Sequence, residues 1–165
     1  MTIRPAQPRD LPALLELFEA AKAFMARTGN PNQWGPGYPG AELMAEEIAR
    51  GVCYVVEEKG EIVGTFCAIP GEDPTYKVIY DGAWPDDDPY ITIHRLASNG
   101  KARGVGRACF AFCEKKGMAL RIDTHADNHV MQDLVTRNGF VYCGRILLAN
   151  GSPRLAYHRP ARKPE

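Results

Sequence analysis

Apolar residues recur along this chain with two different periods, and the order of these periods predicts a mixed α/β fold. Helical spacing begins after Asp10, which we expect to cap a helix, and stops at Gly29-Asn30-Pro31. The apolar positions of this helix are Leu11, Leu14, Leu15, Phe18, Ala21 and Met25. A loop rich in Pro and Gly follows over residues 30–40, and a second helix is expected over residues 41–50.

A period of two residues predicts the strands. Residues 52–58 and 61–69 alternate well enough to form a hairpin around Lys59-Gly60. The next strands are expected as short apolar runs over residues 90–96 and 119–124. Residues 140–148 and 154–158 are expected to pair as a last hairpin across Asn150-Gly151.

Two further helices are predicted between the later strands. The first covers residues 105–116 and is closed by Gly117. The second is capped by Asp127 or Asn128 and ends at Asn138-Gly139. Its inward positions are expected to be Val130, Met131, Leu134 and Val135.

The segment over residues 70–89 has no clear period. Residues 76–80 are its one part with strand character, and residues 84–89 are interpreted as a loop. The resulting order, β-α-α-β-β-β-α-β-α-β-β, predicts an α/β (α+β) fold with one mixed sheet and helices on both of its faces. Without a repeat or a linker, the chain is interpreted as one domain over residues 1–165.

Charge and composition narrow the class of protein. The formal net charge is zero, which gives no electrostatic reason to expect nucleic acid or a membrane as a partner. The N-terminus lacks the apolar core of a secretion signal, so we expect a cytoplasmic location. Five cysteines without CxxC spacing are expected to be buried, reduced thiols, and no metal site is expected.

The segment from Lys101 to Arg107, Lys-Ala-Arg-Gly-Val-Gly-Arg, carries the clearest candidate chemistry. It joins a predicted strand to a predicted helix, so main-chain N–H groups and the helix dipole point at one spot. Lys101, Arg103 and Arg107 add positive charge around it. A pyrophosphate is the simplest occupant.

Other phosphate-binding loops fit this segment less well. A Walker A loop needs Lys and then Ser or Thr after its last glycine, whereas Arg107-Ala108 follows Gly106. A dinucleotide-binding turn needs a third nearby glycine, which is missing here. The remaining pattern, Gln/Arg-x-x-Gly-x-Gly/Ala, resembles the coenzyme A loop of the GNAT superfamily of N-acetyltransferases, with Lys101 as a conservative departure at the first position.

A second signature of the same family follows in the right order and at the right separation. Asn128-His129-Val130-Met131, then Leu134 and Asn138-Gly139-Phe140, resembles its helix that opens on Asn and ends in Gly-Phe. The resemblance extends from Ile3 to about His158. It implies an enzyme that moves an acetyl group from acetyl-CoA to a primary amine by direct attack. A protein or peptide Nα-acetyltransferase and a non-catalytic CoA-binding module remain alternatives, and a homodimer is possible.

The resemblance also implies which residues would hold the cofactor. Main-chain groups at the end of the strand before the loop hold the pantetheine arm in the family. The matching positions and the loop itself are Leu96, Ala97, Ser98, Lys101, Ala102, Arg103, Gly104, Val105, Gly106 and Arg107. Asn128 matches the asparagine that meets the pantetheine, although an Asn at this position is also a favoured helix cap.

The proton transfers are less well determined. His94, two residues before Leu96 and therefore expected on the same strand face, is our candidate general base. A buried structural imidazole is the alternative, and His125 is a weaker candidate. The family's usual acid is a tyrosine at the position of Val135, so thiolate protonation is left to water or to another group such as Tyr142.

Three aromatic residues on predicted loops are candidates for the acceptor site. Trp34, Tyr38 and Trp84 are interpreted either as walls of an acceptor pocket or as lids over the core. The run Asp86-Asp87-Asp88 could attract a cationic amine or form a solvated turn.

Overall fold

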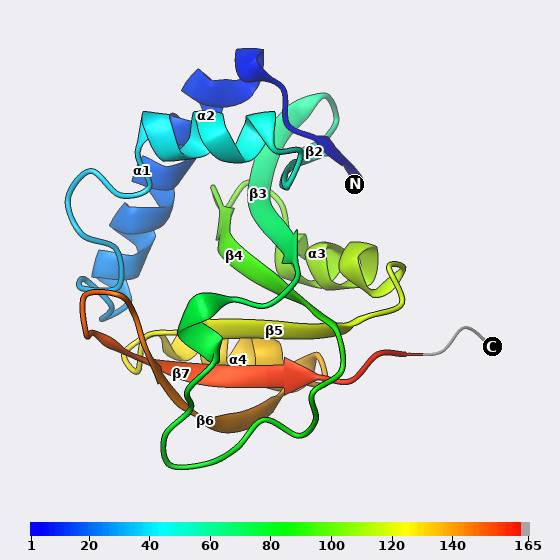
Figure 1. Ribbon diagram of the computed structural model, residues 1–165. Coiled ribbons are helices and arrows are strands. Elements are labelled where there is room, and N and C mark those ends of the chain that lie inside the picture. The colour runs from blue at the N-terminus through cyan, green and yellow to red at the C-terminus, as the bar shows by residue number, and fades with distance from the viewer. Residues whose placement is uncertain (163–165) are drawn as a thin grey trace.

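The computed structural model describes residues 1–162 and confirms the mixed α/β architecture (Figure 1). The strands are β1 (Thr2–Pro5), β2 (Cys53–Glu58), β3 (Glu61–Pro70), β4 (Tyr90–Ser98), β5 (Ala119–Thr124), β6 (Val141–Leu147) and β7 (Pro153–Arg159). The helices are α1 (Leu11–Arg27), α2 (Ala41–Ala49), α3 (Val105–Glu114) and α4 (His129–Arg137). Short 3-10 turns occur at η1 (Pro8–Asp10) and η2 (Pro74–Tyr76).

All strands belong to one seven-stranded sheet in the order β1-β2-β3-β4-β5-β7-β6. Every neighbouring pair is antiparallel except β4 and β5, which run parallel. These two strands pair only from Tyr90 to Thr92, opposite Ala119 to Arg121. Beyond Thr92 they diverge, as Figure 1 shows, and their separation opens the middle of the sheet.

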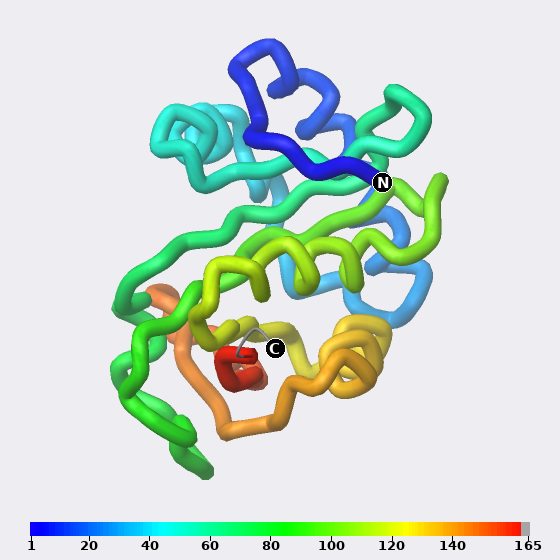
Figure 2. Tube along the Cα trace, turned by 90° about the vertical axis from the view of Figure 1, so that its right-hand side faces the viewer, coloured from blue at the N-terminus to red at the C-terminus, as the bar shows by residue number. Residues whose placement is uncertain are grey.

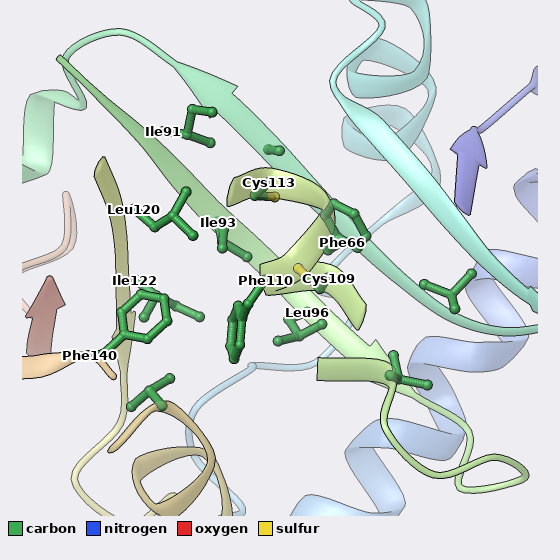
Figure 3. Packing of buried hydrophobic residues seen from close by; sticks show 14 of the residues in the cluster. Phe66, Ile91, Ile93, Leu96, Cys109, Phe110, Cys113, Leu120, Ile122 and Phe140 are labelled. Atoms are coloured by element: carbon green, nitrogen blue, oxygen red, sulfur yellow. The ribbon is translucent and has the colours of Figure 1, made fainter. Parts of the chain in front are cut away.

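Helices cover both faces of the sheet, as the sequence predicts. The apolar stripe of α1 packs with α2 on one face, where Leu14, Phe18 and Met44 are buried. The other face carries α3 and α4, and Figure 2 shows α3 in front of the strands with α1 passing behind them. There the Phe110 ring lies 4.9 Å from the Phe140 ring, among the aliphatic side chains of β4 and β5 (Figure 3).

The structure corrects several details of the helices. Asp10 does not cap α1, because the preceding 3-10 turn directs its carboxylate back to Gln7 N at 2.7 Å and to both terminal nitrogens of Arg4. Leu17, not Leu15, completes the buried stripe of α1. Val130 does not face inward, since 47% of it is exposed.

The segment over residues 70–89 also differs from the expectation. Residues 76–80 form no strand, because Pro74 opens a 3-10 turn that ends at Tyr76. Only Tyr80 makes a β-bridge, to Arg145 on β6. The segment nevertheless packs closely on the sheet, where Tyr76 is 2% exposed.

A β-bulge interrupts β4 next to the opening in the sheet. Arg95 has φ +55°, in the left-handed region, and the β3–β4 register shifts opposite it. Leu96 therefore joins Ile91 and Ile93 in the core beneath α3, whereas His94 lies next to Asp73. The expectation that His94 and Leu96 share a strand face by simple alternation is wrong.

Two further properties of the described residues concern the cysteines and the lengths of the helices. All five cysteines lie within the described residues and are free and buried, as predicted. Among residues 1–162, no helix has both the length and the apolar character needed to cross a membrane.

Candidate active site

Two adjoining cavities lie beside the end of β4, where it diverges from β5. The larger has a volume of about 470 Å³ and lies between the C-terminal half of α1, the end of β4 and the starts of α3 and α4. The smaller has a volume of about 220 Å³ and reaches toward β5, β7 and the loop after α1. Met25, Leu96 and Met131 line both cavities, so the two are neighbours across these side chains.

The larger cavity brings together most of the residues that the sequence assigns to coenzyme A. Those that line it are Leu96, Ala97, Ser98, Ala102, Gly104, Val105, Gly106 and Asn128. Lys101, Arg103 and Arg107 are exposed on the same loop and helix. They do not line the cavity, so their charges lie outside its wall.

The N-terminus of α3 supplies hydrogen-bond donors at this cavity. Gly104 precedes the helix with φ +85°, a left-handed conformation that favours glycine. The first intrahelical bond runs from Ala108 N to Gly104 O at 2.9 Å. The N–H groups of Val105, Gly106 and Arg107 precede this bond and are available to an anion, which the helix dipole also attracts.

Gly106 has a further structural reason to be glycine. A Cβ atom built at this position would lie 2.5 Å from Cδ2 of Leu134 on α4. The missing side chain therefore lets α3 and α4 approach each other closely. Helix packing therefore favours a glycine at position 106 independently of any main-chain contact with a pyrophosphate.

Asn128 is the N-cap of α4, as predicted. Its Oδ1 accepts a hydrogen bond from Met131 N at 2.9 Å. Its Nδ2 donates to Oε1 of Gln33 at 2.9 Å. Because the residue also lines the larger cavity, the cap and a contact with a ligand are compatible, and the contact remains a prediction.

His94 and Asp73 form a hydrogen-bonded pair in the smaller cavity. His94 Nε2 lies 2.9 Å from Asp73 Oδ2. Thr75 holds the other carboxylate oxygen, with its main-chain N at 2.8 Å and its Oγ1 at 2.7 Å. Burial alone would raise the pKa of Asp73, but the hydrogen bonds from His94 and Thr75 lower this pKa to about 2. Asp73 is therefore an ionised and fixed partner for the imidazole.

Asp123 supplies a second carboxylate to the same cavity. Burial raises the pKa of Asp123, although the phenol of Tyr76 donates a hydrogen bond to its Oδ2 at 2.7 Å. Arg154 lines the cavity as well and is itself buried. The lining of the smaller cavity thus includes two carboxylates, an imidazole and the guanidinium groups of Arg95 and Arg154.

Two of the predicted aromatic residues lie at the smaller cavity. The Trp34 ring packs edge-on against Phe18 at 5.7 Å and against Tyr38 at 6.3 Å. The Tyr38 hydroxyl accepts a hydrogen bond from Arg95 Nη1 at 3.2 Å. Glu47 of α2 pairs with Arg95 Nη2 at 3.1 Å, and both side chains are more than nine-tenths buried.

The third aromatic residue lies elsewhere, which corrects its assignment to the acceptor site. Trp84 donates from Nε1 to Tyr76 O at 2.8 Å, and its ring covers the guanidinium of Arg121 at 4.1 Å. It is a structural residue of the segment over residues 70–89. Asp86 belongs to the same segment and accepts from Asp88 N at 3.0 Å, as in a solvated turn.

The alternative base and acid also lie away from the cavities. His125 belongs to the turn between β5 and α4, where its Nδ1 accepts from Asp127 N at 2.9 Å. Tyr142 is 52% exposed on β6. Val135, the position of the family's tyrosine, is fully buried in the core beneath α3.

Six polar residues of the smaller cavity were not predicted from the sequence: Gln33, Asp73, Thr75, Arg95, Asp123 and Arg154. Asp73-Pro74 does carry the signal of a helix cap. Nothing local connects Asp73 to His94, which lies 21 residues away along the chain. Among the described residues, no group of three or more His, Cys, Asp or Glu side chains could hold a metal ion.

Comparison with known proteins identifies the family. The model of the acetyltransferase (GNAT) family matches residues 13–140, which is most of the chain. An acetyltransferase of the GNAT family from Streptococcus agalactiae is 34% identical, with a TM-score of 0.86 over 98% of this chain and 96% of that one. The chain therefore belongs to the GNAT family and is an acetyltransferase.

More distant structures share the fold alone. A phosphinothricin acetyltransferase from Sinorhizobium meliloti, solved in complex with AcCoA, is 16% identical, with a TM-score of 0.63 over 99% of this chain and 92% of that one. The ribosomal-protein-S18-alanine N-acetyltransferase from Escherichia coli is 18% identical, with a TM-score of 0.63 over 99% of this chain and 96% of that one. A search of curated proteins found no match.

Proposed function

We propose that this acetyltransferase moves an acetyl group from acetyl-CoA to the primary amine of a small acceptor, by direct attack of the amine on the thioester. One observation carries the proposal. A cavity with free helix N–H groups at its edge adjoins a second cavity that contains a His–Asp pair. The first has the chemistry to hold a pyrophosphate, and the second has the chemistry to accept a proton.

The larger cavity supports the donor half of the proposal. Val105, Gly106 and Arg107 would donate main-chain hydrogen bonds to the pyrophosphate, with Lys101 and Arg103 adding charge around it. Because β5 separates from β4 after Thr92, the later part of β4 lacks a paired strand on that side. The pantetheine arm would lie along this edge, at Leu96, Ala97 and Ser98.

The smaller cavity supports proton removal from the acceptor. A lysine-like ammonium has a pKa near 10.4, so forming the neutral amine at pH 7 costs about 4–5 kcal/mol. If His94 Nε2 donates to Asp73, the lone pair of Nδ1 is free to take that proton directly or through a water. Asp123, a half-buried carboxylate whose pKa is raised by desolvation in the same cavity, is the second candidate base.

The size and charge of the smaller cavity support a small acceptor. Its volume of about 220 Å³ is below the range usual for sites that take drug-sized ligands. Trp34 and Tyr38 would cover the acceptor, and the carboxylates of Asp73 and Asp123 would attract its ammonium group. A peptide N-terminus would fit only by its first residue or two.

The test is a screen of acceptors by release of CoA thiol from acetyl-CoA. The panel contains small primary amines, amino acids and short peptides with free N-termini. We expect turnover with a small amine, saturable in both substrates. Calorimetric titration with CoA runs in parallel and separates the two halves of the proposal.

The controls are a pair of charge reversals. Arg103→Glu combined with Arg107→Glu should weaken CoA binding without loss of thermal stability, because both side chains are exposed. Arg137→Glu, a reversal at an exposed position of α4, is the matched control. CoA binding without turnover of any amine would contradict the proposed reaction and favour a non-catalytic CoA-binding module. Turnover of peptides alone would favour an Nα-acetyltransferase.

A further inference from the structure

Gln33, in the loop after α1, is the acceptor of an unusual number of hydrogen bonds. Its Oε1 lies within hydrogen-bond distance of four donors. They are Asn30 Nδ2 at 2.9 Å, Asn128 Nδ2 at 2.9 Å, Thr124 Oγ1 at 3.2 Å and His125 N at 3.4 Å. Because all these donors face one atom, the Gln33 amide is oriented with Oε1 toward them; the flipped amide would place an NH2 donor against them.

The main chain of Gln33 is held as well. Its carbonyl oxygen accepts a hydrogen bond from Arg154 Nη2 at 2.9 Å, and Arg154 is a buried residue of β7. Trp34 is the next residue, and Tyr38 follows in the same loop. Gln33 therefore fixes the start of the loop that carries both aromatic residues of the smaller cavity.

Asn128 connects this anchor to the larger cavity. One end of its side chain caps α4 through Met131 N, and the other end donates to Gln33. Gln33 lines the smaller cavity, whereas Asn128 lines the larger one. A single hydrogen bond between two side chains thus spans the two cavities.

We propose that Gln33 is a positioning residue that couples the two cavities, so that CoA bound beside Asn128 orders the loop bearing Trp34 and Tyr38 for the acceptor. The inference rests on the proposed function, because it requires CoA in the larger cavity. Coupling between sites is reciprocal, so an ordered loop also favours CoA binding. Ordinary coupling between two sites changes affinity by about fivefold or more.

The chain offers a direct reporter of this loop. It contains two tryptophans, Trp34 and Trp84, so a Trp84→Phe protein has Trp34 as its only one. Acrylamide quenching of Trp34 fluorescence is measured with and without saturating CoA, and calorimetry measures CoA binding to the same protein. In the Trp84→Phe background we expect CoA to reduce the quenching of Trp34.

Two substitutions cut the connection from opposite sides. Gln33→Leu removes the accepting oxygen, and Asn128→Ser keeps a helix cap but removes the amide donor. Each should abolish the CoA-dependent reduction in quenching and weaken CoA binding by about fivefold. Gln33→Glu retains an accepting oxygen and should preserve the reduction. Asn32→Ala, at an exposed position of the same loop, is the matched control.

The outcomes separate the inference from the function on which it rests. Absence of CoA binding to the parent protein by calorimetry would overturn the proposed function itself. If CoA binds and still protects Trp34 in Gln33→Leu, the protection comes from direct contact and the coupling through Gln33 is wrong. Loss of protection in Asn32→Ala as well would likewise overturn the specific role of Gln33.

Discussion

His94 and Arg95 are neighbours on β4 that serve different parts of the molecule. The left-handed conformation of Arg95 places its guanidinium with Glu47 of α2, while His94 pairs with Asp73. The sequence allowed His94 to be chosen as a candidate because its strand leads into the CoA loop. It could not reveal the bulge, since the residue at the left-handed position is an arginine and not a glycine.

His94→Ala should lower turnover by about 10²-fold or more if His94 is the general base. CoA affinity should stay unchanged, since His94 lines only the smaller of the two cavities. The initial rate of CoA thiol release at saturating acetyl-CoA and acceptor measures the change. His129→Ala, at an exposed histidine, is the matched control. A variant that retains the wild-type rate would exclude His94 as the general base.

Glu47→Ala should destabilise the protein by about 3 kcal/mol or more, because it leaves the buried guanidinium of Arg95 without its carboxylate. Chemical denaturation measures this loss. Glu46→Ala, an exposed position on the same helix, controls for the change in helix composition. Equal stability of the two variants would show that the pair does not hold the bulge.

At the scale of elements, the periodic patterns located the helices and most strands because burial on one face imposes the period. The same patterns gave wrong predictions where an apolar residue serves tertiary packing or lines a cavity. In residues 76–80 only Tyr76 and Ile79 pack in the core, where Tyr76 is hydrogen-bonded to Asp123, whereas Val78 and Tyr80 are exposed, and the segment forms no strand. Val130 is apolar on an exposed helix face because it borders the larger cavity.

The contact between α3 and α4 gives a test of the glycine at position 106. Gly106→Ala gains about 1 kcal/mol in helix propensity. The new Cβ also crowds Leu134, so we expect the substitution alone to be neutral or destabilising. In a Leu134→Ala background the crowding is relieved, and the same change should stabilise. Thermal denaturation of the four proteins measures the interaction. Equal effects in both backgrounds would mean that Leu134 does not constrain this position.

At the scale of the whole molecule, the fold could be predicted from the sequence. The contacts between residues far apart in the chain could not. The two signatures located most of the larger cavity, because one covers the end of β4, the loop and the start of α3, and the other covers the start of α4. The α1 side of this cavity carries no such signature. The smaller cavity is built from loops and strand ends far apart in the chain. Its key contacts, such as Tyr76 with Asp123, have no local signal.

The stability of the whole molecule should depend on pH through His158, which is buried on β7. Burial lowers the pKa of His158, and nearby Arg121 lowers it further, while Asp86 and Asp88 partly oppose this shift. Below about pH 6.5 the unfolded chain therefore binds a proton that the folded chain does not, and stability falls as pH decreases.

Urea denaturation at pH 7.5 and 5.5 measures this effect, with His158→Gln as the comparison. The wild type should lose more stability than the variant over this interval. Asp10 and Asp73 do not interfere, because their lowered pKa values matter only below about pH 4. An identical pH dependence in both proteins would exclude His158 as its source.

The short pairing of β4 with β5 also has a mechanical consequence. Main-chain hydrogen bonds join the two strands only from Tyr90 to Thr92. The sheet therefore consists of two panels, β1-β2-β3-β4 and β5-β7-β6, with few hydrogen bonds between them. Each panel should open and close as a separate cooperative unit, visible as two classes of amide hydrogen exchange. A ligand that contacts both Leu96 on one panel and Met131 beside the other would hold the two panels together. Amide hydrogen exchange should then slow in both panels at once.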